Sequence, residues 1–206
     1  MAKKEIPDII IGRLPVYLRA LRHMEAQGKH TTSSQELGEQ VGISAAQIRK
    51  DLSQFGEFGK QGTGYSIAFL VAKVREILNV DKVWEVAVVG MGDMGHAIAR
   101  YQGFHDRGFR VAMVFDSDPT KIGEQVGKFT VQDTKEMGVA IRKAGIRIAM
   151  LCVPAAAAQQ VANQLVEAGV KAILNYAPIN LNVPRGVWVQ YLDPTVGLQR
   201  MTYYLD

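Results

Sequence analysis

The most constraining feature of the sequence is the stretch VAVVGMGDMGHAIARY at residues 86–101, where three glycines follow an apolar run with GxGxxG spacing. They are Gly90, Gly92 and Gly95. At such a turn the missing side chains let backbone N–H groups approach a pyrophosphate, and the N-terminus of the following helix attracts its charge. The pattern predicts a dinucleotide-binding turn, yet about eighty residues precede it and need a function of their own.

The sequence from residue 83 onwards alternates between apolar runs and helical patterns. Five apolar runs have strand character, at residues 84–90, 109–116, 146–153, 170–177 and 186–192. Helical patterns lie between them, at residues 93–108, 135–145 and 155–169. Buried strands alternating with helices indicate a parallel sheet with helices on both faces. We therefore predict an α/β fold with a Rossmann-type doubly wound parallel sheet.

An acidic residue at the end of the second strand completes the predicted nucleotide site. Asp116 lies where a carboxylate accepts hydrogen bonds from ribose hydroxyls, with Asp118 as the alternative. A carboxylate there repels a 2′-phosphate, which favours NAD(H) over NADP(H). The loops CVPAA and NYAPIN also follow strand ends, where such folds bind ligands. The predicted cofactor-binding residues are Gly90, Met91, Gly92, Asp93, Met94, Gly95, Asp116, Val153, Pro154, Asn175, Ala177 and Pro178.

The first eighty residues carry the pattern of a helix-turn-helix. In LPVYLRALRHMEAQG, leucines recur at helical spacing, and Pro15 suits the first turn of the helix. Two capping boxes follow, Ser33 with Glu36 and Ser44 with Gln47. The two short helices that they begin are joined by a turn containing glycine, which predicts a helix-turn-helix.

The second of these helices has a core face and a neighbouring face suited to DNA. Ala45, Ile48 and Leu52 turn to the core, while small and cationic residues on the neighbouring face can approach a phosphate backbone. We expect Arg49 and Lys50 in the major groove, where Arg49 contacts a base or only a phosphate. The segment FGEFGKQGTGYSI predicts a wing, a hairpin whose basic tip reaches the minor groove. The predicted DNA-binding residues are Ser44, Ala46, Gln47, Arg49, Lys50, Ser53, Lys60 and Gly62.

Composition narrows the class of protein. The net charge is +4, and residues 1–80 hold 11 Lys and Arg against 8 Asp and Glu, which favours an anionic partner for this part. The single cysteine, Cys152, excludes an internal disulfide framework and favours a reducing cytoplasm. We expect no export signal, since no basic and then apolar segment opens the chain, and no apolar stretch approaches the roughly 20 residues that span a membrane. No histidine has metal-ligand spacing with cysteine or carboxylate.

The ligand-side loops lack a His/Asp or Lys/Tyr set that would serve hydride transfer, so we expect the nucleotide to be a signal and the protein not to be an enzyme. Two alternatives remain. One is an NAD-dependent dehydrogenase with an accessory N-terminal domain. The other is a regulator that senses coenzyme A or another nucleotide.

The sequence closely resembles the Rex family of bacterial redox-sensing transcriptional repressors. The segments RLPVYLRAL, SSQELG, QIRKDLSQFGEFGKQGTGY, GMGDMGHAIARYQGF, FDSDPTKIG, NYAPINLNVP and YYL recur in order, nearly from end to end. The resemblance implies a winged-helix domain at residues 1–80, a Rossmann domain at 81–193 and a C-terminal helix within 194–206 that is swapped between the subunits of a homodimer. It also implies binding to palindromic operator DNA when NAD⁺ dominates, and release when NADH binds.

The same resemblance implies a switch of three residues and adds Tyr101 to the cofactor-binding set. It places Arg13, Tyr101 and Asp193 where the winged helix, the nucleotide pocket and the swapped helix meet. We expect Asp193 to pair with Arg13 in the DNA-competent state and to turn to the Tyr101 hydroxyl when NADH binds, so that the subunits rotate.

The chain departs from the family pattern at several positions. Family members often carry Asn, Leu and a larger polar residue where this chain has Asp93, Met94 and His96, and we expect Asp93 to weaken dinucleotide affinity. Gln61 stands where the wing commonly has Arg, which softens the expected minor-groove contact. Pro194 replaces a bulky apolar residue near the nicotinamide.

Overall fold

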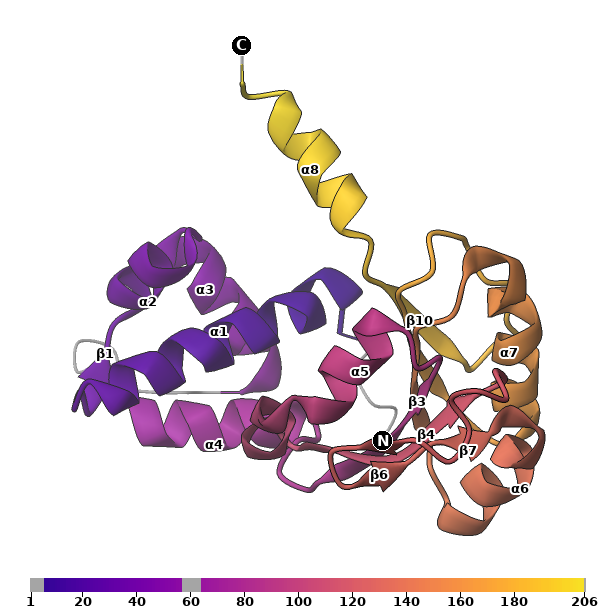
Figure 1. The fold of residues 1–206 in the computed structure, drawn as a ribbon. Helices are drawn as coiled ribbons and strands as arrows, with labels where there is room; N and C mark the ends of the chain where they lie inside the picture. Colours follow the sequence, from indigo (N-terminus) through magenta and orange to yellow (C-terminus); the bar gives the residue numbers. More distant parts are fainter. Residues whose placement is uncertain (1–5, 57–63, 206) are drawn as a thin grey trace. The chain divides into compact units, whose positions relative to one another are not determined.

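The computed structural model describes residues 6–56 and 64–205. The chain divides into two units, Met1–Lys82 and Val83–Asp206, and the elements of each can be followed in Figure 1. The division falls between the helix-turn-helix pattern and the first strand of the dinucleotide-binding pattern.

The first unit is a small helical domain with one short antiparallel sheet. Its elements are α1 (Asp8–Ala26), β1 (Thr31–Thr32), α2 (Ser34–Val41), α3 (Ala45–Leu52), the 3₁₀ turn η1 (Ser53–Phe55), β2 (Tyr65–Ser66) and α4 (Ile67–Ile77). Leu14, Leu37, Ile48 and Leu70 are fully buried at its centre. Strand β2, which follows the predicted wing segment, is held in place by antiparallel pairing with β1. The expected tip of the wing, with Lys60, Gln61 and Gly62, lies outside the described residues.

The start of α1 differs from the sequence prediction. The helix begins at Asp8, so Pro15 lies inside it and not in its first turn. Pro15 removes one backbone donor from the helix, a cost that is tolerated because it lies on the exposed side while Leu14 and Tyr17 face the core. Tertiary burial of the apolar face therefore extends the helix past a residue that favours a helix start.

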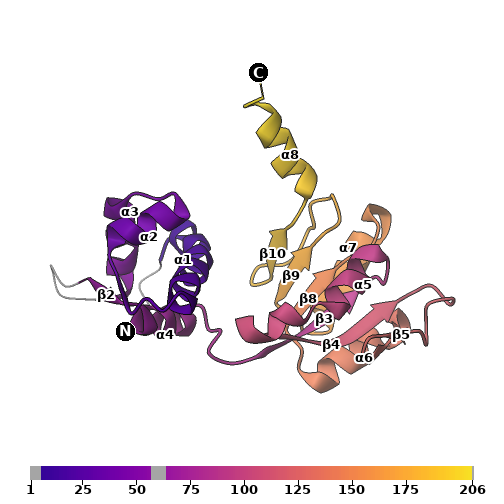
Figure 2. The same ribbon diagram turned by 60° about the vertical axis from the view of Figure 1, so that its left-hand side comes forward.

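The second unit contains a six-stranded sheet in which every pairing is parallel. Its strands are β3 (Trp84–Val89), β4 (Phe109–Asp116), β7 (Gln132–Asp133), β8 (Ile148–Leu151), β9 (Ala172–Asn175) and β10 (Trp188–Tyr191). The strand order is β10-β9-β8-β3-β4-β7, and Figure 2 shows β10, β9, β8 and β3 side by side. The order reverses between β3 and β8, which is where such sheets bind ligands.

Helices cover both faces of this sheet. Alternate residues of β3 divide between the faces: Ala87 and Val89 pack with α6 (Thr134–Ala144) and α7 (Ala155–Glu167), whereas Val86 and Val88 pack with α5 (Asp93–Arg100). The period of two along a strand produces this division. The predicted doubly wound α/β fold is confirmed.

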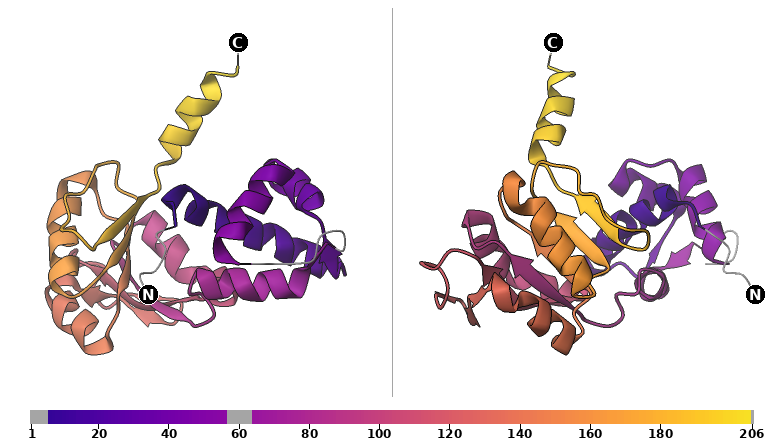
Figure 3. Two further views of the ribbon diagram at one scale, coloured as in Figure 1. Left: turned by 180° about the vertical axis from the view of Figure 1, so that it is seen from behind. Right: turned by 90° about the vertical axis from the view of Figure 1, so that its right-hand side faces the viewer.

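Some local elements were not anticipated. The helical pattern at 93–108 breaks at Tyr101 into α5 and the 3₁₀ segment η2 (Gln102–Arg107), and a small hairpin of β5 (Gln125–Val126) and β6 (Phe129–Thr130) precedes β7. The last helix, α8 (Pro194–Thr202), follows β10 (Figure 3) and buries none of its residues.

Candidate functional site

The three glycines of the GxGxxG turn have different environments. Gly90 has φ +96°, and a Cβ there would lie 2.5 Å from the carbonyl oxygen of Cys152 at the end of β8. A Cβ at Gly95 would overlap the carbonyl oxygen of Gly90, which lets α5 pack closely on the turn. A Cβ at Gly92 would meet nothing within 4 Å. Gly90 and Gly95 are thus required by the fold, while Gly92 leaves open space over the turn.

Gly92 is also the N-cap of α5, and no side chain caps this helix. The first N–H groups of a helix have no partner within it and favour an anion. Asp93 and Met94 are exposed in the first turn, and Met94 keeps 47% of its surface. The Met91 side chain is fully buried in the core beneath the turn. Only the backbone of Met91 is therefore available to the turn. The turn can bind a phosphate group with backbone donors alone.

Asp116 links the end of β4 to the glycine turn. Its Oδ2 accepts a hydrogen bond from the Met91 N–H at 2.6 Å, and its Oδ1 accepts one from the Asp118 N–H at 2.9 Å. The Lys121 ammonium lies 3.6 Å from Oδ2. A carboxylate can accept about four hydrogen bonds, so acceptor sites remain for ribose hydroxyls. Asp116 therefore both fixes the turn and presents charge to a ligand.

A cavity of about 340 Å³ opens between the ends of β3, β4 and β8. Asp116 lines it, whereas the alternative Asp118 does not and instead accepts hydrogen bonds from Thr120 at 2.9 and 2.8 Å. The lining residues are Val89, Gly90, Gly92, Asp116, Ser117, Lys121, Thr134, Cys152, Val153, Pro154, Ala157, Gln160, Val161 and Gln164. The cavity brings together the glycine turn, Asp116 and the CVPAA loop. Residues from each of these three segments belong to the predicted cofactor-binding set.

Residues of the NYAPIN loop do not line this cavity. The Asn175 side chain is buried, donates to the carbonyls of Ala177 and Ile179 at 3.0 Å each, and accepts from the Ala177 N–H at 3.0 Å. Its amide therefore holds the loop, and Ala177 is buried with it. Pro178 is exposed beside them.

Cys152 and His96 lie beside the turn, and their surroundings set their protonation. Burial raises the pKa of the Cys152 thiol to about 12, which keeps it protonated and unreactive. His96 bonds through Nδ1 to the Gly92 carbonyl at 3.0 Å and through Nε2 to Glu124 at 3.1 Å. These two partners, the carbonyl first, raise the pKa of His96. The side chain is thus directed to Glu124.

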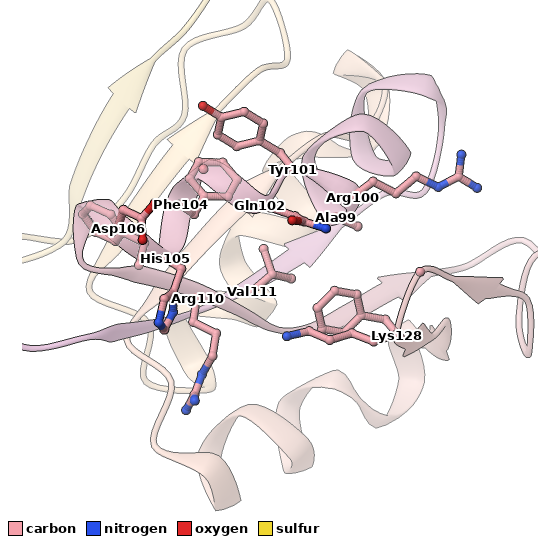
Figure 4. Close-up of a pocket in the computed structure, with 14 residues that line it drawn as sticks. Ala99, Arg100, Tyr101, Gln102, Phe104, His105, Asp106, Arg110, Val111 and Lys128 are labelled. Atoms are coloured by element: carbon pink, nitrogen blue, oxygen red, sulfur yellow. The ribbon is translucent and has the colours of Figure 1, made fainter.

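Tyr101 lines a second hollow of about 910 Å³ at the amino end of β4. Figure 4 shows Tyr101 beside Phe104, and their rings meet edge to face at 4.9 Å between centres. The guanidinium groups of Arg100 and Arg110 lie far apart at the rim, and Arg110 pairs with Glu85. These two guanidinium groups therefore do not form a common anion site.

The candidate DNA-reading surface is built on α2 and α3. Ser33 and Ser44 cap these helices by accepting from the N–H groups of Glu36 at 3.0 Å and Gln47 at 3.3 Å, as predicted. A Cβ at Gly38 would overlap the Ile43 carbonyl oxygen, which fixes the close approach of the turn.

On α3, Ala46, Arg49 and Lys50 are exposed, as is Ser53 directly after it, while Ile48 and Leu52 are buried. The Ser53 hydroxyl donates to the Lys50 carbonyl at 2.8 Å, and the Arg49 guanidinium donates to Ser34 Oγ at 3.0 Å. Lys50 thus projects from an otherwise well-anchored helix end.

The residues of the expected switch each have partners within their own unit. Arg13 binds Asp51, and Asp193 caps α8 by accepting from the Thr195 N–H at 2.9 Å. Pro194 occupies the first turn of that helix.

Sequence reasoning missed Asp51, the buried partner of Arg13, and the cavity residues Lys121, Gln160 and Gln164. In the part of the chain that the structure describes, no group of His, Cys, Asp and Glu could hold a metal, and no helix is long and apolar enough to cross a membrane.

These features define a class of proteins that join a helix-turn-helix DNA-binding domain to a dinucleotide-binding domain. Two family models match: "Putative DNA-binding protein N-terminus" over residues 5–53 and "CoA binding domain" over residues 81–179. The redox-sensing transcriptional repressor Rex of Roseiflexus sp. (strain RS-1) is 54% identical over 98% of this chain and 92% of its own length. The chain belongs to the Rex family.

Two solved structures agree with this assignment. The Rex-family repressor RSP in complex with β-NAD⁺ and operator DNA has a TM-score of 0.93 and 37% identity, covering 98% of this chain and 94% of RSP. RSP in complex with β-NADH has a TM-score of 0.90 and 35% identity, covering 98% and 95%.

Proposed function

We propose that this chain is a redox-sensing repressor that binds palindromic operator DNA and is released from it when NADH binds its Rossmann domain. The observation that carries the proposal is the union in one chain of an exposed cationic helix face, at Arg49 and Lys50, with an open dinucleotide turn at Gly92. The complexes of RSP with NADH, and with NAD⁺ and operator DNA, support it.

The cavity at the turn favours a signalling role over catalysis. Among the described residues that line it, the charged side chains are Asp116 and Lys121, and Cys152 adds a protonated thiol. Asp116 accepts backbone hydrogen bonds and has Lys121 beside it, so neither is placed as a free acid or base. An NAD-dependent dehydrogenase would need such a group at the nicotinamide.

Charge gives the physical reason for sensing NADH. NAD⁺ carries a cationic nicotinamide, and closing an apolar pocket over a cation costs desolvation free energy, whereas the ring of NADH is neutral. Only a difference in affinity between conformations can drive release. We expect NADH to bind at least tenfold more tightly than NAD⁺, about 1.4 kcal/mol.

A homodimer accounts for the exposed last helix. In α8, Val196, Leu198 and Met201 each keep more than 60% of their surface. A helix that exposes these apolar side chains needs a partner, and a two-fold dimer matches the two-fold symmetry of a palindromic operator. We propose that residues 194–206 are swapped between subunits, that residues 1–80 and 81–193 are the two domains, and that the protein acts in the cytoplasm.

Within this dimer, Asp193 of one subunit is the proposed moving part of the switch. It pairs with Arg13 when DNA is bound and with the Tyr101 hydroxyl when NADH is bound. Asp193→Ala should bring the effect of NADH on operator affinity close to zero while NADH still binds, and Tyr101→Phe should keep DNA binding and blunt the NADH response. If Asp193→Ala is released by NADH as readily as the unmodified protein, the switch is wrong.

The test of the function is a gel-shift titration. The unmodified protein selects a palindromic duplex from a randomised library, and that duplex is then titrated with NADH, NAD⁺ and coenzyme A. Release by NADH at concentrations at least tenfold below those of NAD⁺ supports the proposal. Absence of any selected DNA favours a dehydrogenase, and release by coenzyme A alone favours the coenzyme A sensor.

A further inference from the structure

Asp51 on α3 is a fully buried carboxylate with an unusually complete set of partners. Arg13 donates to it twice, from Nε to Oδ2 at 2.6 Å and from Nη2 to Oδ1 at 2.7 Å. The Tyr17 hydroxyl donates to Oδ2 and the Gln47 amide nitrogen to Oδ1, both at 2.7 Å. Each carboxylate oxygen therefore accepts two hydrogen bonds, the full capacity of an ionised carboxylate.

The network joins two helices. Arg13 and Tyr17 lie one turn apart on α1, and Gln47 and Asp51 lie one turn apart on α3. A buried charge with all its partners is held rigidly, because movement of either helix would leave it unpaired. Although burial opposes its ionisation, the hydrogen bonds from Arg13, Tyr17 and Gln47 hold the pKa of Asp51 below its ordinary value. Asp51 thus remains a charged acceptor at neutral pH.

The consequence for Gln47 concerns DNA reading. Gln47 is half-exposed one turn before Lys50 on the candidate recognition helix. Because Asp51 can only accept, it binds the amide nitrogen of Gln47 and leaves the amide oxygen as the acceptor that the network does not use. In the major groove, an acceptor at this position pairs with the amino group of adenine or cytosine.

We propose that Asp51 is a positioning residue for sequence-specific operator binding: it fixes α3 on α1 and orients the Gln47 amide so that its oxygen reads an amino group in the major groove. The inference rests on the proposed operator binding. Arg13 uses two of its five N–H groups on Asp51, and its side chain remains 21% exposed. The guanidinium therefore keeps N–H donors for a second acceptor while it holds α3.

The test compares base preference with overall affinity in the full-length protein. Asp51→Asn introduces an amide that cannot accept all four bonds, Gln47→Ala removes the reading group, and Gln27→Ala, on an exposed residue bonded to His23, is the control. The operator is the duplex selected by the unmodified protein. The readouts are its Kd by fluorescence anisotropy, the Kd for an unrelated duplex, and the preference at each base pair of the half-site.

We expect Asp51→Asn and Gln47→Ala to lower the ratio of specific to non-specific affinity by about tenfold, the cost of one lost base contact of about 1–3 kcal/mol. Both should relax preference at the same base pair, which general loosening of the domain would not do. Gln27→Ala should keep every preference. Equal losses on both duplexes, or relaxation at different base pairs, would overturn the inference.

Gln47→Ala leaves the Arg13–Asp51 pair in place, so it decides the question even if Asp51→Asn does not fold. Full retention of preference by Gln47→Ala overturns the proposal. The proposed function fails separately, if the unmodified protein selects no duplex or keeps it in the presence of NADH.

Discussion

The glycine turn allows a test that separates ligand binding from folding. Gly92→Ala adds a methyl group where no protein atom lies within 4 Å, and its backbone (φ −80°, ψ −169°) is accessible to alanine. Its free energy of unfolding should stay within about 0.5 kcal/mol of the unmodified value, or rise slightly because alanine has fewer unfolded conformations than glycine. The added methyl lies where a pyrophosphate must approach backbone N–H groups.

We therefore expect Gly92→Ala to lose at least tenfold in NADH affinity, about 1.4 kcal/mol, with a melting temperature that is unchanged or slightly higher. Gly95→Ala is the matched control, because its Cβ would overlap the Gly90 carbonyl oxygen. Such overpacking costs about 1–3 kcal/mol or more, which lowers Tm by about 2–4 °C per kcal/mol in a protein of this size.

The assays are thermal unfolding without ligand and calorimetric titration with NADH. The reasoning is refuted if Gly92→Ala binds NADH as tightly as the unmodified protein. It is also refuted if Gly92→Ala loses as much stability as Gly95→Ala, since the open space would then not be reserved for a ligand.

Three further predictions concern charge. Asp116→Asn should weaken NADH binding and narrow the preference for NADH over NADPH. The substitution removes the negative charge that repels a 2′-phosphate and leaves the positive charge of Lys121 beside it. Equal affinity of the unmodified protein for NADH and NADPH would contradict the role of Asp116. Lys50→Ala should weaken operator binding and reduce the slope of log K against log salt by about one, whereas an unchanged affinity at every salt concentration would remove Lys50 from the interface. The Gly92 carbonyl and the Glu124 carboxylate raise the pKa of His96, so the stability that the charged imidazole contributes is present below about pH 6.5. This contribution is lost as the pH rises through the higher pKa of the folded state. Melting curves of His96→Gln should therefore show a smaller fall in Tm over that range than the unmodified protein, and an identical pH profile would contradict this.

The sequence predicted those parts of the fold whose cause is local. Alternate residues of β3, such as Val88 and Val89, divide between two cores, and this period is visible in the sequence. The caps at Ser33 and Ser44 depend on a residue three positions away, so the helix starts were predicted correctly. The start of α1 was not, because its apolar face packs in a way that local propensity at Pro15 does not encode.

The candidate site was predictable to a smaller extent. Nothing in the local sequence singles out Asp51, because its burial depends on Arg13, 38 residues earlier in the chain. Lys121 approaches Asp116 only because the loop after β4 turns back on itself. Asn175 has the residue type of a ligand contact, but hydrogen bonds within its own loop already use its amide. For Asp51 the outcome depends on a contact between distant segments, whereas for Lys121 and Asn175 it depends on how a loop folds back on itself.

The central claim is that NADH and operator DNA oppose each other through one protein, and thermodynamic linkage tests it directly. The factor by which NADH lowers operator affinity must equal the factor by which operator DNA lowers NADH affinity. NADH is titrated calorimetrically into the free protein and into the protein saturated with its selected duplex. We expect NADH to bind at least tenfold more weakly to the DNA complex, matched by the loss of operator affinity in anisotropy. Identical NADH affinity with and without the duplex would contradict the account.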